Sequence, residues 1–490
     1  MVFFKKVLSD FMNINPIQRQ SLLSFGSLLA VTGIGYIATF YFAHTLGPAP
    51  LGAYFIFLAY YGIFDLVGDG GFGGAAVKRI SEGKEQNEYF TAFFISRAVL
   101  LCFSIVLFIL ISPWIPDLQE NGLLYWLIIA LITGSVASIT GTNLYGTSQV
   151  GIMQVSNLFN TIIKNMVQIL AVFIGFGIGG LIAGFVAGTI AAIIINLKFI
   201  RLTLSRCNRS HFTGLLSFSI WTFLSSGGAL MFTYADTILI GLFMTDADVG
   251  IYRVAFQLTS VASFIIMAFH TVLFPRISKW HTENNFSLIE FSMAKAFTYS
   301  LFIGIPITAG GIILSEKLLY YLYGASFVSG SSVLIILLFV QIVNIFMFLL
   351  TTCLNAMDMP KTSFYITAGS ALLNIVMNIL LIPQYGIVGA AVASLVTISI
   401  NAALAYIALK SFLHISMDKR VILNLGVSAL IMSLALIAYV SVFPVQDFIG
   451  LVLVLGFSAI IYFAAVLGID RSIRNDLKGL LDTMHIPLIP

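Results

Sequence analysis

The chain has 490 residues, of which 59% are hydrophobic and only 9% are charged. A soluble domain needs roughly a quarter of its residues charged to cover its surface, so this composition excludes a soluble protein. The net charge of +4 is too small to indicate a nucleic-acid partner. Most of the surface is therefore expected to face lipid.

A membrane-spanning helix needs about 20 mostly apolar residues, and the chain contains about fourteen such segments. In the first half they are 21–43, 51–74, 91–112, 123–144, 152–175 and 178–200. In the second half they are 216–243, 249–273, 293–314, 331–353, 363–383 and 387–409, followed by 421–441 and 447–468. The sequence thus predicts an all-α polytopic membrane protein.

Positive charge is concentrated on one side of the predicted bilayer. With a cytoplasmic N-terminus, nearly all loop cations fall on the inner side, beginning with Lys5 and Lys6. The outer segments carry one clear cation, Lys317, beside acidic residues such as Asp117 and Glu120. By the positive-inside rule, this bias predicts cytoplasmic termini and an even number of spans.

A weak internal repeat predicts two pseudo-symmetric six-helix lobes with two additional C-terminal helices. Leu51 to Tyr54 opens the second span and Val249 to Tyr252 opens the eighth, each after an outer loop, while Gly177 to Gly180 matches Gly386 to Gly389. Two such halves in the same orientation are typical of transporters with a site between them. Chance recurrence of glycine-rich helix starts is the alternative. The predicted domains are 1–210, 211–412 and 413–490.

The fifth span carries a line of polar side chains. Asn157, Asn160, Lys164 and Gln168 recur at spacings of three, four and four, which places them on one helical face. Lys164 lies midway along the span, where an ionisable group needs a cavity or a partner. We interpret this stripe as substrate-binding, with Lys164 as an anion contact. The alternative is interhelical hydrogen bonding with Lys164 neutral or paired with a carboxylate. The eleventh span repeats the spacing without a charge at Thr367, Ser370, Asn374 and Asn378.

Two further groups of charged residues lie inside predicted spans. Asp65 and Asp69 share one face of the second span, and Arg97 lies at similar depth in the third, where it can pair with either. The two carboxylates fit a proton or Na⁺ carrier or, equally, a latch that closes the inner end. Asp236 and Arg253 lie near the outer side of the seventh and eighth spans. We group Asp236 with the ion-coupling or gate candidates, and Arg97 and Arg253 with the substrate-binding cations. A structural salt bridge between Asp236 and Arg253 is the alternative.

Motifs of other chemistries are absent from the sequence. There is no GxxxxGK[ST], so ATP is not expected to drive the protein directly. There is no HExxH or GxSxG, and the three cysteines show no CxxC spacing. The sequence predicts no catalytic residues, cofactor or metal.

The order and spacing of several short segments resemble the polysaccharide-transporter, or O-antigen-like oligosaccharide flippase, family of the multidrug/oligosaccharidyl-lipid/polysaccharide exporter superfamily. The segments are His44 to Pro48, Leu51 to Tyr54, Gly71 to Gly74, Asp236 to Gly241, Val249 to Tyr252, Phe274 to Arg276, Asn355 to Met357 and Tyr385 to Ala391. This resemblance covers nearly the whole chain.

The resemblance implies a flippase that moves a polyprenyl-diphosphate-linked oligosaccharide from the inner to the outer leaflet by alternating access, for cell-surface glycan synthesis. It implies a multi-pass protein of the plasma or inner membrane whose partners are that glycan and membrane lipid, with polysaccharide polymerase or assembly proteins as further candidates. We expect no nucleic-acid partner and a monomer. The alternatives are a multidrug and toxin extrusion-type cation antiporter, a lipid II flippase, and a non-transporting scaffold.

Overall fold

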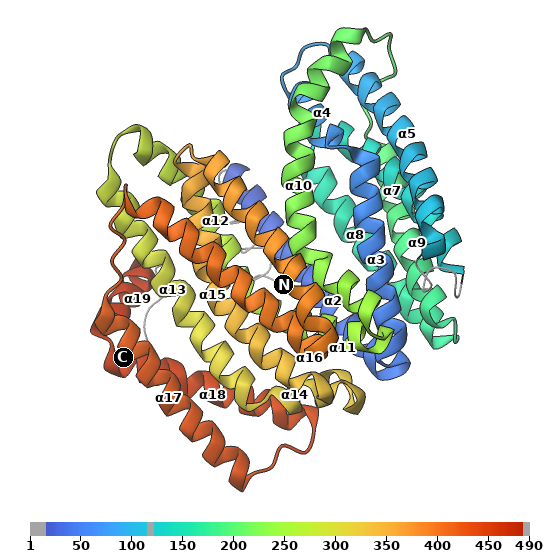
Figure 1. Ribbon diagram of the computed structural model, residues 1–490. Helices are drawn as coiled ribbons and strands as arrows, with labels where there is room; N and C mark the ends of the chain where they lie inside the picture. The colour runs from blue at the N-terminus through green and yellow to red at the C-terminus, as the bar shows by residue number, and fades with distance from the viewer. Residues whose placement is uncertain (1–15, 115–121, 484–490) are drawn as a thin grey trace, which may run out of the picture. The chain divides into compact units, whose positions relative to one another are not determined.

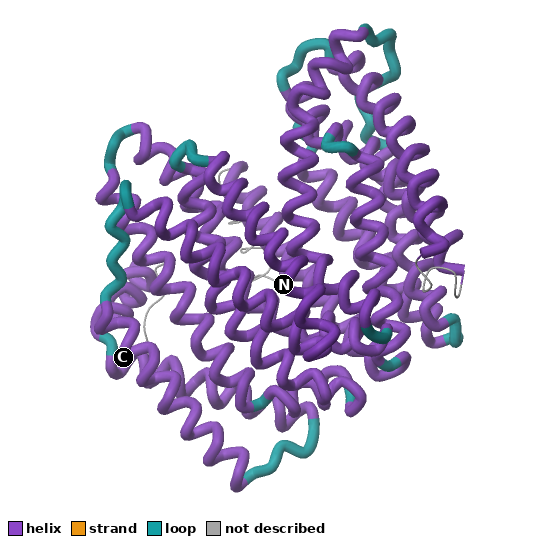
Figure 2. Tube along the Cα trace, viewed as in Figure 1, coloured by secondary structure: helices purple, strands orange, loops and turns teal. Residues whose placement is uncertain are grey.

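The computed structural model describes residues 16–114 and 122–483, which form helices and no strand (Figure 1). Figure 2 shows how short most of the connecting loops are. The predicted loop charges Lys5, Lys6, Asp117 and Glu120 lie outside the described residues. The chain divides into two compact units, Met1–Ile238 and Leu239–Pro490, called here the N-terminal and C-terminal units. The predicted lobe boundaries at residues 210 and 412 stay a prediction.

The N-terminal unit is a bundle of long helices in which α8 and α9 pack along each other and α3 contacts α5 and α7. Its elements are α2 (Pro16–Leu46), α3 (Pro48–Asp69), α4 (Phe72–Ser81), α5 (Gln86–Ile111), the 3₁₀ turn η1 (Ser112–Trp114), α7 (Leu123–Gly146), α8 (Val150–Phe173) and α9 (Gly177–Leu197). The next helix, α10 (Arg209–Phe243), begins in this unit and ends in the C-terminal unit.

The C-terminal unit contains two 3₁₀ segments and the remaining helices. They are α11 (Asp246–Thr259), η3 (Ser260–Ser263), α12 (Phe264–Thr282), α13 (Phe286–Ile313), α14 (Ser315–Tyr323), η4 (Ala325–Gly330), α15 (Ser331–Ala356), α16 (Pro360–Lys410), α17 (Lys419–Val442), α18 (Phe448–Ile469) and α19 (Arg471–Thr483). A capping box begins α11, in which Thr245 and Asp248 satisfy each other's backbone N–H groups. The hairpin of α17 and α18 packs against α13.

The helix α16 contains both the eleventh and twelfth predicted spans. Its backbone leaves the helical conformation at Gly386, where φ is 60° and ψ is −145°, three residues after Pro383. The Asn374 side chain on the first arm donates to Ser394 and Thr397 on the second, at 3.4 and 3.3 Å. The two arms therefore pack against each other as a hairpin.

The predicted spans fall on helical residues to within a few positions, but two of them are interrupted. The second crosses the break between α3 and α4, and the eighth crosses the 3₁₀ segment between α11 and α12. Within the described part of the chain, nine helices are long and apolar enough to cross a membrane, or ten if the bent α10 is one span. The helix α8 is not one of the nine, because its polar stripe lowers its hydropathy. The count of fourteen stays a prediction.

The short helix α19 is anchored to the C-terminal unit at two points. Asp470, which is 3% exposed, accepts hydrogen bonds from Asn424 on α17 and from the Ile473 backbone, so it caps α19 and holds it to α17. Further along, Asp476 pairs with Lys295 and accepts a 2.7 Å bond from Tyr299, both on α13. Lys295 is therefore paired with a carboxylate of α19.

This anchor is expected to hold at neutral pH and to fail only in acid. Burial by itself would raise the pKa of Asp476, but hydrogen bonds from Lys295 and Tyr299 and the Lys295 charge bring it below its ordinary value. A carboxylate whose pKa is lower in the folded state contributes stability above its unfolded pKa of about 4 and loses that contribution as the pH falls through its folded pKa. Because both side chains are 35% exposed, the contribution is about 0.2–1 kcal/mol.

We therefore expect Asp476→Asn to loosen α19 at pH 7, while the unmodified chain loosens only below about pH 4. At pH 7 the measurement is maleimide labelling of a cysteine placed at the buried Ile473, with the three native cysteines replaced. Below about pH 4, where thiols react too slowly with maleimide, it is hydrogen exchange of the α19 backbone amides. The exposed neighbour Asn475→Ala is the control and should label like the parent chain. Equal labelling of the parent and Asp476→Asn would show that the pair does not hold the helix.

Candidate functional site

A buried arginine joins three helices at the centre of the N-terminal unit. Arg97 on α5 is 0% exposed, and its Nε donates to Ser135 on α7 at 2.9 Å. Its guanidinium pairs with the Asp65 carboxylate, donates to the Asp65 backbone oxygen at 3.1 Å, and lies 3.3 Å from an Asp69 carboxylate oxygen. Arg97 therefore pairs with both carboxylates, whereas the sequence left open which one it would meet.

The two carboxylates also line a cavity of about 440 Å³. The side chains of Asp65 and Asp69 are 32% and 22% exposed, while Arg97 lies entirely beneath them. The cavity's other polar lining side chains are Ser138, Thr142 and Tyr145. The wall of this cavity thus presents two anionic groups partly neutralised by one cation from behind, which suits a cation or proton better than an anion.

The helix α3 ends at Asp69, and the two residues that follow adopt a backbone conformation that requires glycine. Gly70 and Gly71 have φ of 57° and 77°, and a Cβ on Gly71 would lie 2.1 Å from the Ser219 oxygen of α10. Across this break, the Gly73 backbone N–H donates to Asp69 at 3.2 Å. Asp69 is therefore bound both to α5, through Arg97, and to the start of α4.

The polar stripe on α8 lies opposite the exposed apolar face of the helix. The exposed apolar side chains of α8 occupy the side of the helix opposite the stripe. They are Val155, Phe159, Met166, Ile169, Leu170 and Phe173. On the stripe, Asn157 is exposed and Asn160 and Lys164 are half-buried. These three side chains therefore lie on the protein-facing side of α8 and retain access there.

Gln168 is buried, unlike the other three residues of the stripe. It is 2% exposed and donates to the Tyr54 hydroxyl on α3 at 3.0 Å and to the Leu181 oxygen on α9 at 2.7 Å. Both donors of its amide are thus used to hold helices together. This is the interhelical hydrogen bonding that the sequence offered as an alternative for the stripe.

The helix α9 approaches the stripe through glycine. A Cβ on Gly188 would lie 2.7 Å from the Lys164 Cβ, and one on Gly184 would lie 2.3 Å from the Gln168 Cγ. Any larger residue at these positions would push the helices apart. None of the ion pairs formed by the described residues involves Lys164, so the structure gives no carboxylate partner for it.

In the polar line of the eleventh span, Asn374 and Asn378 form a hydrogen-bond network within the α16 hairpin. Asn378 donates to Asn374 at 3.0 Å, and Asn374 donates across to the second arm.

Arg253 on α11 lies with its guanidinium carbon 5.3 Å from the Phe256 ring. Asp236 and Arg253 fall in different units, so their pairing stays a prediction.

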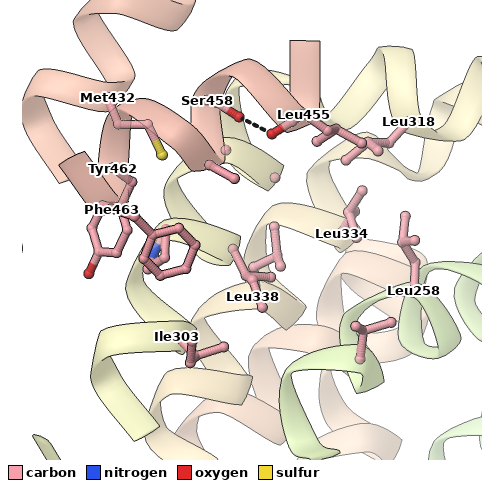
Figure 3. A pocket seen from close by; sticks show the side chains of 16 residues that line it. Leu258, Ile303, Leu318, Leu334, Leu338, Met432, Leu455, Ser458, Tyr462 and Phe463 are labelled. Atoms are coloured by element: carbon pink, nitrogen blue, oxygen red, sulfur yellow. Dashed lines mark hydrogen bonds between the residues drawn. The ribbon is translucent and has the colours of Figure 1, made fainter. Parts of the chain in front are cut away.

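An apolar pocket of about 390 Å³ lies within the C-terminal unit (Figure 3). Leu258, Ile303, Leu338 and Phe463 converge on it, and its only side chains with a polar atom are Ser458 and Tyr462. The Ser458 hydroxyl is used within its own helix, donating to the Leu455 oxygen at 2.9 Å. The pocket therefore offers a surface suited to hydrocarbon.

Comparison with known families accounts for this combination of an apolar multi-helix fold and intramembrane charge. A family model described as polysaccharide biosynthesis protein matches residues 18–281, more than half of the chain. The chain belongs to the polysaccharide biosynthesis protein family. A second family model, MatE, matches residues 223–380. These matches confirm the resemblance that the short sequence segments indicate.

Two similar proteins come from Haloferax volcanii. A probable low-salt glycan biosynthesis flippase, Agl15, is 28% identical over 96% of this chain and 99% of its own length. A probable flippase, AglR, is 25% identical over 94% of this chain and 98% of its own. The similarity extends over essentially the whole length of each relative.

Solved structures with the same fold include members of two transporter groups. Lipid II flippase MurJ in an inward closed conformation has a TM-score of 0.75 at 20% identity, covering 93% of this chain and 99% of its own. An inward-facing multidrug resistance MATE family transporter has a TM-score of 0.63 at 13% identity, covering 78% and 95%. These likenesses confirm the predicted all-α polytopic transporter fold.

Proposed function

We propose that the protein is a flippase that carries a polyprenyl-diphosphate-linked oligosaccharide from the inner to the outer leaflet. The observation that carries this proposal is the full-length similarity to a probable glycan biosynthesis flippase, in a chain of the polysaccharide biosynthesis protein family. The protein acts as a multi-pass membrane transporter. An enzymatic role, which the sequence does not predict, is not part of the proposal.

Within this function, Lys164 is the proposed contact for the diphosphate. It is a cation on the protein-facing side of α8 with no carboxylate partner among the described ion pairs. Asn157 and Asn160, which precede it on the same face, are the proposed sugar contacts, since a glycan needs many hydrogen-bond partners. Arg253 stays a proposed second cation for the substrate.

Two residues predicted to bind substrate have surroundings that favour other roles. Arg97 is fully buried and its donors are directed to Asp65, Asp69 and Ser135, and both Gln168 donors hold helices. We therefore assign Arg97 and Gln168 to positioning the helices rather than to touching substrate. This leaves the stripe with Lys164 as its charged contact.

For Asp65 and Asp69 we propose the gate or ion-coupling role. Their carboxylates border the cavity, and Asp69 links α5 to α4 across the Gly70–Gly71 break. A proton or Na⁺ that competes with Arg97 for these oxygens would weaken the link and free α4. Asp236 stays a proposed member of the same group.

The rival function, cation extrusion, is favoured by one observation, the anionic wall of that cavity. It is opposed by Lys164, because a cation near the midplane repels a cationic substrate. Lipid II transport differs from our proposal only in the glycan, and a scaffold has no need of intramembrane charges.

We propose that the protein works as a monomer in the cell membrane with both termini cytoplasmic, supplying glycan to polymerase or assembly proteins.

The test is a reconstitution of the purified full-length chain in liposomes. We expect a fluorescent polyprenyl-diphosphate oligosaccharide to become accessible, over time, to a membrane-impermeant glycosidase, and protein-free liposomes to show no such change. Parallel liposomes test a lipid-linked muropeptide and a fluorescent cation under H⁺ or Na⁺ gradients. Cation transport without glycan movement would establish the antiporter instead.

A further inference from the structure

A second apolar pocket, of about 380 Å³, lies toward the end of the C-terminal unit that carries its cationic loops. We call it the aromatic slot. It is lined by Phe297 of α13, Phe346 and Leu350 of α15, Tyr406 of α16, and Ile415 and Met417 of the loop before α17. The Phe297 and Phe346 rings stack with centroids 5.1 Å apart. This pocket shares no residue with the site proposed above.

The aromatic slot has a closed floor and an open rim. Phe297 and Leu350 are each 3% exposed, whereas Tyr406 at the rim is 45% exposed. Leu404 and Ile407 beside it on α16 are 44% and 63% exposed, which marks a surface that faces hydrocarbon. An apolar groove at the expected depth of the acyl chains suits a hydrocarbon chain, since water gains no hydrogen bonds there.

Exposed cations border the same pocket. Lys410 follows Tyr406 by one helical turn on the same face of α16, about 6 Å further along the axis. Lys419 lies two residues after Met417, within about 7 Å of backbone, and Arg420 follows it. The slot therefore opens next to three cations at the expected level of the headgroups.

The neighbouring carboxylates are engaged elsewhere. Glu290 accepts a 2.6 Å hydrogen bond from the His414 backbone, which fixes the loop under the slot. Asp418 accepts from the Arg420 backbone at 2.9 Å and caps α17. No ion pair among the described residues involves Lys410, Lys419 or Arg420. The three cations are thus available to an anion from outside the chain.

We infer that this end of the C-terminal unit binds a phospholipid with an anionic headgroup, its acyl chain in the aromatic slot and its phosphate on Lys410, Lys419 and Arg420. The partly exposed Tyr406 lies between the aromatic slot and the three cations, and it has an apolar ring and a polar hydroxyl. The bound lipid ties α13, α15 and α16 to the loop that leads into α17.

The test is native mass spectrometry of the full-length protein released from bilayers of equal phosphatidylglycerol and phosphatidylcholine. We expect retained lipid to be enriched in phosphatidylglycerol. The triple variant K410Q/K419Q/R420Q should lose that enrichment by about fivefold or more, since each cation beside the bound headgroup contributes several-fold to anionic-lipid binding. The matched control R201Q/R206Q/R209Q, which removes three exposed cations from the N-terminal unit, should keep it.

The slot is tested separately from the charges. Ala403 also lines the slot, and Ala403→Phe should fill it and lower the retention of both lipids. The control Leu404→Phe, on the adjacent lipid-facing side, should leave retention unchanged. Circular dichroism confirms that each variant is folded. Equal retention of the two lipids by the parent chain, or unchanged retention in Ala403→Phe, would overturn the inference, whatever the outcome of the glycan assay.

Discussion

Replacing Lys164 by alanine is expected to lower the rate of glycan translocation severely while leaving the protein folded in the membrane. A charge-assisted hydrogen bond contributes about 1.5–3 kcal/mol, which corresponds to a loss of about tenfold to more than 100-fold. The liposome assay measures this directly as the rate at which the labelled glycan becomes accessible. Lys164→Arg should keep part of the rate because the charge remains, whereas Lys164→Gln should behave like alanine.

The matched control is Lys198→Ala, the same side-chain change at the exposed end of the next helix. It should translocate at the parental rate. If Lys164→Ala also did so, Lys164 would have no part in binding the diphosphate, and its place on α8 would need a structural explanation. Because α9 packs on Lys164 through Gly188, folding is checked for every variant by its unfolding transition.

Replacing Arg97 by methionine is expected to lower the free energy of unfolding by about 3 kcal/mol. Removing one partner of a buried ion pair leaves the other charge uncompensated and costs about 3–5 kcal/mol. The lower end applies because Asp65 and Asp69 are partly exposed to their cavity. The measurement is the free energy of unfolding in mixed micelles.

Two variants separate charge from packing at this position. The triple variant R97M/D65N/D69N removes the carboxylate charges as well and should recover much of the lost stability, since no unpaired charge remains. Arg79→Met is the surface control: its pair with Glu82 is exposed, so its effect should stay below about 1 kcal/mol. A triple variant as unstable as Arg97→Met would show that the charges are not the cause.

Much of the fold follows from hydropathy and charge, whereas parts of the site do not. Apolar segments of about 20 residues predict the helices, and the matching depth of Arg97 with Asp65 and Asp69 predicts their association. The role of Gln168 was not predictable, because one helical face carried both it and Lys164. The structure shows that Gln168 holds helices together, because it places Tyr54 and the Leu181 backbone oxygen within hydrogen-bond distance of its amide. The sequence alone does not show these positions.

The C-terminal anchor could not be predicted for a related reason. Lys295 and Asp476 are separated by 181 positions, and neither stands in a motif that links them. A lysine near the end of a span is expected to reach toward the interface. The sequence offers one indication of this pair, Tyr299, which lies one turn from Lys295 on α13. A second polar group on the same face suggests that both bind a shared partner.

The polar stripe of α8 also bears on how the protein is made. A lysine at the centre of a span costs about 2.5–3.5 kcal/mol on the scale for translocon insertion, and α8 is not among the nine described helices that are long and apolar enough to cross a membrane. The following helix, α9, is one of those nine helices and is joined to α8 by a few residues. We therefore expect the two helices to enter the bilayer together during synthesis, with α9 completed before Lys164 leaves the aqueous phase.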